Sequence, residues 1–87
     1  MQLLTKEILD KRYKHPVEFY TRKGKNVKKE IEDEWIIDTR LSIFKRDDSL
    51  LYNIWREDEE DEILLFKAKY VEELDTLLEI MKRYENE

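Results

Sequence analysis

Three apolar runs between Trp35 and Phe66 form the clearest pattern in the chain. They read WIIDTRLSIF, LLYNIW and EILLF, and short polar breaks separate them. Side chains in the first two runs alternate between the two sides of an extended chain, which is the period of a β-strand. The aspartates and serine at 47–49 give a turn signal between these runs. The pattern predicts three successive antiparallel strands, over 36–44, 50–55 and 62–70.

Two details of this region refine the prediction. The continuous apolar start of the last run is typical of a strand in the centre of a sheet. The run 50–55 also has the spacing of a short helix, which Asp48 or Ser49 would open. Its aromatic and β-branched residues favour the strand.

The segment before these runs predicts a helix followed by a hairpin. The pairs Leu4–Ile8 and Leu9–Tyr13 have helical spacing over residues 3–14, with Thr5 as the N-cap and Pro16 as the stop. The sequence VEFYTR then alternates like a half-buried strand. The KGKN sequence at 23–26 predicts a turn, because Gly and Asn tolerate positive φ. Residues 27–34 fit either a helix face or an edge strand, and the preceding turn favours the strand.

The last segment predicts a second helix with one apolar stripe. The stripe consists of Val71, Leu74, Leu77, Leu78, Met81 and Tyr84. Acidic residues in its first turns and basic residues near its end suit the helix dipole. The expected fold is a single α+β domain over 1–87, a two-layer sandwich. It has an N-terminal helix, an antiparallel sheet of four or five strands, and a C-terminal helix packed on one face.

The composition argues against catalysis, cofactors and metal ions. The chain has no cysteine and one glycine, which excludes thiolate metal sites and a glycine-rich phosphate loop. Its only histidine, His15, has no partner suggested by spacing and is expected at the surface or at a helix cap. Neither serine lies in a nucleophile-elbow pattern. No apolar run approaches the roughly 20 residues of a membrane span, and no signal peptide is recognisable, so a cytoplasmic location is expected.

The charges are distributed unevenly along the chain. Residues 1–29 carry nine Lys and Arg against three Asp and Glu, whereas residues 30–87 carry eight against nineteen. Such asymmetry concerns binding partners rather than the fold. It defines an acidic and a basic candidate site.

The acidic candidate is a run of six carboxylates with a second cluster before the first apolar run. The residues are Glu57, Asp58, Glu59, Glu60, Asp61 and Glu62, with Glu32, Asp33 and Glu34. The simple interpretation is a solvated loop that limits aggregation. The sharper hypothesis is a row of carboxylates that imitates a phosphate backbone and binds another protein. In size and charge, though in no motif, the chain resembles small acidic phage inhibitors of nucleases. This predicts a non-catalytic inhibitor or regulator, carried by a phage or mobile element, that binds a host or defence protein.

Two alternatives use other residues. The first is a nucleic-acid-binding module that contacts phosphates through the basic hairpin. Its residues are Arg22, Lys23, Lys25, Lys28 and Lys29. The second is a homodimer formed through an apolar sheet face that the helices leave open. Its residues are Ile36, Phe44, Leu51 and Trp55.

Overall fold

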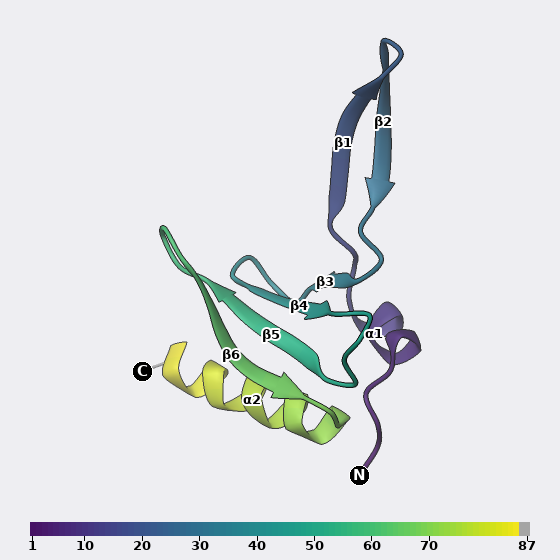
Figure 1. Cartoon of the computed structure of the whole chain (residues 1–87). Coiled ribbons are helices and arrows are strands. Elements are labelled where there is room, and N and C mark those ends of the chain that lie inside the picture. The colour runs from purple at the N-terminus through teal and green to yellow at the C-terminus, as the bar shows by residue number, and fades with distance from the viewer. Residues whose placement is uncertain (86–87) are drawn as a thin grey trace.

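The computed structural model describes residues 1–85 and shows a short helix, a long hairpin, a small antiparallel sheet and a second helix (Figure 1). In chain order the elements are α1 (Lys6–Arg12), β1 (Val17–Arg22), β2 (Lys25–Glu30), β3 (Glu34–Ile36), β4 (Leu41–Lys45), β5 (Tyr52–Glu57), β6 (Glu62–Ala68) and α2 (Val71–Glu85). The predicted α+β class is confirmed.

The strands form two separate sheets rather than one. Strands β3, β4, β5 and β6 make a four-stranded antiparallel sheet in sequence order, and β1 pairs only with β2. Figure 1 shows the β1–β2 hairpin projecting away from the rest of the chain. We call this hairpin the arm. The strand predicted over 17–22 is confirmed as β1, but it is not half-buried, because every residue after Val17 is exposed and Phe19 is 75% exposed.

Two backbone hydrogen bonds close the base of the arm. The N–H of Ile31 donates to the carbonyl of Pro16 at 2.9 Å, and the N–H of Ile36 donates to Lys14 at 2.8 Å. At the tip, Lys23 and Gly24 adopt positive φ angles of 51° and 75°. The predicted turn is therefore confirmed, but Asn26 lies in β2 rather than at a left-handed turn position.

The N-terminal helix is shorter than predicted. Thr5 is its N-cap and accepts the N–H of Ile8 at 3.3 Å, as expected, but the helix ends at Arg12. Leu3 and Leu4 are extended because they pair with the segment before α2. There the N–H of Leu4 donates to the carbonyl of Lys69 at 2.9 Å.

The predicted strand over 36–44 is broken into β3 and β4. Asp38 causes the break, because its carboxylate accepts the N–H groups of Arg40 at 2.8 Å and Leu41 at 2.9 Å. A hydrogen bond between a side chain and the backbone two or three residues later stabilises a turn. The turn then replaces the strand–strand hydrogen bonds that a continuous strand would form. The turn at 47–49 and strand β5 follow the prediction, and the helical alternative for 50–55 is wrong.

Strand β6 lies at the edge of the sheet, not at its centre. It pairs with β5 on one side only, and an irregularity in register opposite Ile54 and Trp55 marks a bulge. The prediction failed because a continuous apolar run occurs both in a central strand and in an edge strand that lies beside a helix. Here the run reflects a strand beside α2, with Phe66 lining a groove against that helix.

Helix α2 begins where predicted, at Val71. The carboxylate of Glu73 accepts the N–H groups of Lys69 and Tyr70, both at 3.0 Å, and so satisfies donors at the helix start. The side chain of Tyr84, the last residue of the predicted stripe, lies outside the described part of the structure.

The core joins one face of the sheet to both helices. Trp35, Ile43 and Ile54 lie opposite one another on β3, β4 and β5, so their side chains share a face. Leu9 of α1 and Leu74 of α2 pack in the same cluster, and all five are fully buried. The other sheet face, which we call the open face, carries Ile36, Ser42 and Trp55 in one row.

Leu9 gives a test of this packing. Leu9→Ala removes a fully buried side chain from the junction of α1 with the sheet, so we expect it to lower the free energy of unfolding by about 2–5 kcal/mol. Urea denaturation followed by circular dichroism measures the change. Leu50→Ala is the control, because Leu50 is 82% exposed and its loss should cost less than about 0.5 kcal/mol. Equal effects of the two substitutions would contradict the described core.

Candidate functional site

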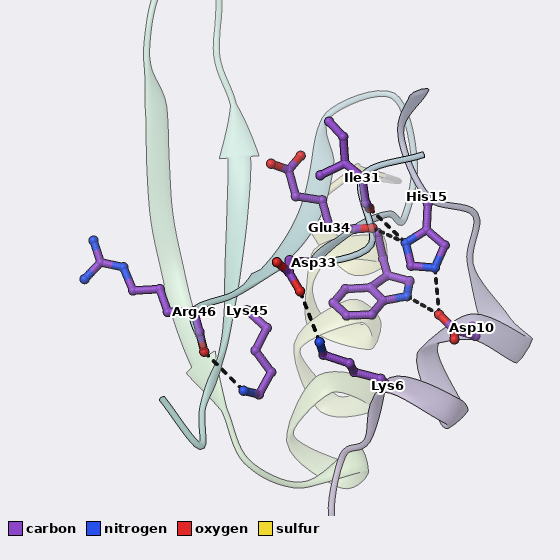
Figure 2. A network of polar contacts seen from close by, with 9 residues as sticks. Lys6, Asp10, His15, Ile31, Asp33, Glu34, Lys45 and Arg46 are labelled. Carbon is purple, nitrogen blue, oxygen red and sulfur yellow. Dashed lines mark hydrogen bonds and ion pairs between the residues drawn. The ribbon is translucent and has the colours of Figure 1, made fainter. Parts of the chain in front are cut away.

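A polar network joins α1, the base of the arm and β3 (Figure 2). One carboxylate oxygen of Asp10 accepts Nε2–H of His15 at 2.8 Å and Nε1–H of Trp35 at 2.8 Å. The other ring nitrogen of His15, Nδ1, lies 2.7 Å from the carbonyl oxygen of Glu34 and 3.0 Å from that of Ile31. The imidazole therefore bridges the helix and both ends of the link from β2 to β3.

The partners of His15 determine its protonation. Carbonyl and carboxylate oxygens only accept hydrogen bonds, so these contacts are all satisfied together only when both ring nitrogens carry a proton. Partial burial lowers the pKa of His15, but the Glu34 carbonyl and the Asp10 carboxylate raise that pKa by more, and it lies above its ordinary value. The hydrogen bond from Trp35, helped by His15, lowers the pKa of Asp10.

This network is structural in character. Both nitrogens of His15 are engaged, which leaves the ring no lone pair for proton abstraction or metal binding. The expectation of a surface or helix-capping histidine missed the network, because the five-residue spacing of Asp10 and His15 fits no motif. A buried tryptophan whose indole N–H needs an acceptor was the only available signal.

A groove with acidic walls runs across the open face of the sheet. It has a volume of about 490 Å³ and lies between the base of the arm at Pro16 and the β5–β6 hairpin. Ile36 and Trp55 give it an apolar floor, because they belong to one cross-strand row. The carboxylates of Glu34, Glu57 and Glu62 border it, and with Asp38 they outnumber the one cation that lines it, Arg40.

The pKa of Glu34 reports this excess of negative charge. Partial burial raises the pKa, and the neighbouring carboxylates of Glu62 and Glu18 raise it further. Like charges from β1 and β6 thus act on Glu34 of β3 at the groove. A bound cation would relieve their mutual repulsion.

The acidic run occupies the β5–β6 hairpin. Its six side chains are all exposed, and within residues 1–85 none of them forms an ion pair. Glu57 and Glu62 face each other at the hairpin base and border the groove. The four residues between them form the tip, where the N–H of Asp58 donates to the carbonyl of Asp61 at 2.7 Å.

The second acidic cluster does not form one surface. Asp33 is paired with Lys6 at 3.1 Å, Glu34 borders the groove, and Glu32 lines a separate pocket beside His15. Of these three, only Glu34 joins the acidic hairpin at a common site.

The five predicted basic residues lie together on the arm. Arg22 and Lys25 are paired across the strands next to the tip, and the others lie at the turn and along β2. All five are exposed, and none forms an ion pair within the described part of the chain. Within the described residues, the acidic clusters therefore form no ion pair with the basic turn.

The four predicted apolar interface residues do not all lie at one site. Ile36 and Trp55 form the groove floor, while Phe44 lies on the same face in the next row, between Glu34 and Asn53. Leu51 precedes β5 and does not line the groove. The structure therefore brings an apolar strip and an acidic border together at one place.

Comparisons with known proteins found no matching family model, curated protein or solved structure. Within residues 1–85, no group of three or more His, Asp or Glu side chains is placed to hold a metal ion. No helix in the described chain is long and apolar enough to cross a membrane.

The polar network predicts a pH-dependent stability. Because the pKa of His15 is above 6.5 in the folded protein, its contribution is complete below about pH 6.5 and is lost as the pH rises through the raised value. His15→Gln removes this contribution and keeps every carboxylate. We expect the difference in unfolding free energy between wild type and variant to shrink from about pH 5.5 to about pH 9. A difference that stays constant or grows in urea titrations would contradict a protonated His15.

Proposed function

We propose that the chain is a non-catalytic binding module that holds a cationic segment of another protein in the acidic groove. The most concrete version is an inhibitor or regulator, carried by a phage or mobile element, that acts on a host or defence protein. The observation that supports this most directly is the groove itself. Three carboxylates border an apolar floor, and no ion pair within the described chain neutralises them.

The groove suits a partner with both charge and apolar surface. Charge-assisted hydrogen bonds from Lys or Arg to Glu34, Glu57 and Glu62 would supply orientation. The aromatic face of Trp55 offers an anchor of the type common at interface centres. An Arg side chain, which is planar and apolar on its faces, fits this combination better than Lys.

Nucleic-acid mimicry is the sharpest form of the proposal. The tip carboxylates continue the charge of the groove border along the β5–β6 hairpin. A protein surface that normally binds phosphates would meet a row of exposed carboxylates there. Electrostatic contacts of this kind speed association and weaken as salt is added.

The groove carboxylates provide the first test of this function. We expect Glu57→Gln with Glu62→Gln to weaken partner binding at least about tenfold, because two charge-assisted contacts are lost. Glu7→Gln with Glu30→Gln is the matched control, since it removes the same charge from exposed residues outside the groove. Pull-downs from host lysate with tagged wild type and variants measure retention of the partner. Circular dichroism verifies that each variant folds.

The salt dependence completes this test. Replacing all six residues of the acidic hairpin by Ser should abolish capture at about 50 mM salt, where charge contacts are strongest. Retention of the same partner by that variant would overturn the acidic site and leave the apolar sheet face as the binding surface.

A second candidate function, nucleic-acid binding, rests on the arm. A two-stranded β-ribbon fits the major groove of DNA. The arm is an exposed ribbon with Arg22, Lys23 and Lys25 at its tip and Lys28 and Lys29 nearer its base. Phe19 and Tyr20 are also exposed, at 75% and 42%, and lie on opposite faces of β1. These rings would be available for stacking on bases.

A gel shift distinguishes the two functions. If the arm binds nucleic acid, the protein should retard labelled DNA or RNA at about 50 mM salt, with steep loss of binding as salt rises. Lys23→Gln with Lys25→Gln should then weaken the shift, whereas Lys82→Gln with Arg83→Gln, the same change of charge on α2, should not. A protein that shifts neither nucleic acid at low salt has no such function.

A further inference from the structure

The charged residues of the arm are distributed unequally between its two faces. Side chains of residues paired across an antiparallel ladder lie on one face, and the faces alternate along each strand. One face, which we call the Tyr20 face, pairs Glu18 with Lys29, Tyr20 with Val27 and Arg22 with Lys25. The opposite face, which we call the Phe19 face, pairs Val17 with Glu30, Phe19 with Lys28 and Thr21 with Asn26.

The Tyr20 face is the basic one. Its three cations, Arg22, Lys25 and Lys29, are set against one carboxylate, Glu18, which leaves a net charge of +2. The Phe19 face carries one lysine and one glutamate, so its net charge is zero. A polyanion is therefore attracted to the Tyr20 face more strongly than to the Phe19 face.

Two cations of the Tyr20 face repel each other beside the tip of the arm. Arg22 and Lys25 lie directly opposite one another, and like charges in this position destabilise a ladder. Within the described residues, neither of them forms an ion pair. A phosphate group bound between the two side chains removes the repulsion, because its oxygens accept hydrogen bonds from both. The pair thus favours an anionic ligand at the tip.

The acids at the base of the arm are too distant to oppose such a ligand strongly. Glu18 precedes Arg22 by four residues on β1, which is about 13 Å at about 3.3 Å per residue. Charges in water are largely screened beyond about 10 Å at 0.1 M salt. Every residue from Thr21 to Asn26 is exposed, and the tip points away from the four-stranded sheet (Figure 1). The outer half of the arm is therefore an accessible basic surface.

We propose that the arm enters the major groove of double-stranded DNA with its Tyr20 face toward the base pairs. The proposal rests on the second candidate function, nucleic-acid binding by the arm, and assigns the ligand and the face that contacts it. The major groove of DNA is about 12 Å wide and admits a two-stranded ribbon, whereas that of an RNA duplex is too narrow for side chains to read. In this orientation the guanidinium of Arg22 suits the two acceptors of a guanine, and Lys25 suits a phosphate.

Two matched substitutions on β2 test which face contacts DNA. Lys25 and Lys28 are both exposed and lie on opposite faces, and Lys25→Gln removes the same charge as Lys28→Gln. In gel shifts with a labelled DNA duplex, we expect Lys25→Gln to weaken binding at least about threefold at about 100 mM salt. It should also reduce the slope of log K against log salt by about 0.9, the value of one phosphate contact.

Lys28→Gln should change the affinity less than about twofold and leave the salt slope unchanged, because it loses no phosphate contact. Circular dichroism verifies that both variants fold. If the two variants reduce the slope equally, the assignment of the Tyr20 face is overturned, while nucleic-acid binding by the arm stands.

A comparison of probes tests the ligand. Wild type should bind the DNA duplex at least about tenfold more tightly than an RNA duplex of the same sequence. Equal or tighter binding of the RNA duplex, or of single-stranded DNA, overturns insertion into the major groove but leaves the arm a nucleic-acid-binding element. If wild type shifts none of these probes at about 50 mM salt, this proposal and the second candidate function both fail.

Discussion

The hydrogen bonds that meet at the Asp10 carboxylate connect the N-terminal helix to the sheet and to the base of the arm. They join α1 to the protonated His15 and to the indole of Trp35, the largest fully buried side chain. His15 in turn fixes the carbonyls of Ile31 and Glu34, where the chain returns from the arm. The arm has no core of its own, and an isolated hairpin is marginally stable in water. Its direction therefore depends on this network and on the two backbone bonds at its base.

The same geometry explains why the charges of the chain do not neutralise one another. The basic residues lie on the arm and the acidic run lies on the β5–β6 hairpin, two projections from different parts of the fold. The ion pairs seen elsewhere involve helix residues, such as Arg12 with Asp75 at 2.7 Å. Such separation keeps two oppositely charged surfaces available, and it supports the proposal of a binding module.

The sequence predicted the elements better than their assembly. Alternation and turn chemistry located the arm, β5, β6 and α2, because these signals are local. The prediction of the N-terminal helix failed where a distant partner decides, because Leu3 and Leu4 leave the helix to pair beside Lys69. The prediction of one strand over 36–44 failed for a local reason, because the carboxylate of Asp38 bonds to the backbone of Arg40 and Leu41 and breaks a strand that the neighbouring residues favour. The apolar run of β6 was equally compatible with a central strand and an exposed edge.

For the candidate site, the acidic run was visible in the sequence. Its meeting with Glu34, Ile36 and Trp55 was not, because cross-strand register creates it.

The central claim is that the two charged projections are held apart and left without partners in the free protein. The salt dependence of the free energy of unfolding tests this claim most directly. Wild type is compared with the variant in which all six residues of the acidic hairpin are Ser, between about 20 mM and about 500 mM NaCl. If the acids only repel one another, salt should stabilise wild type more than the variant. If salt instead destabilises wild type more than the variant, the acids are paired with cations in solution, and the account is wrong.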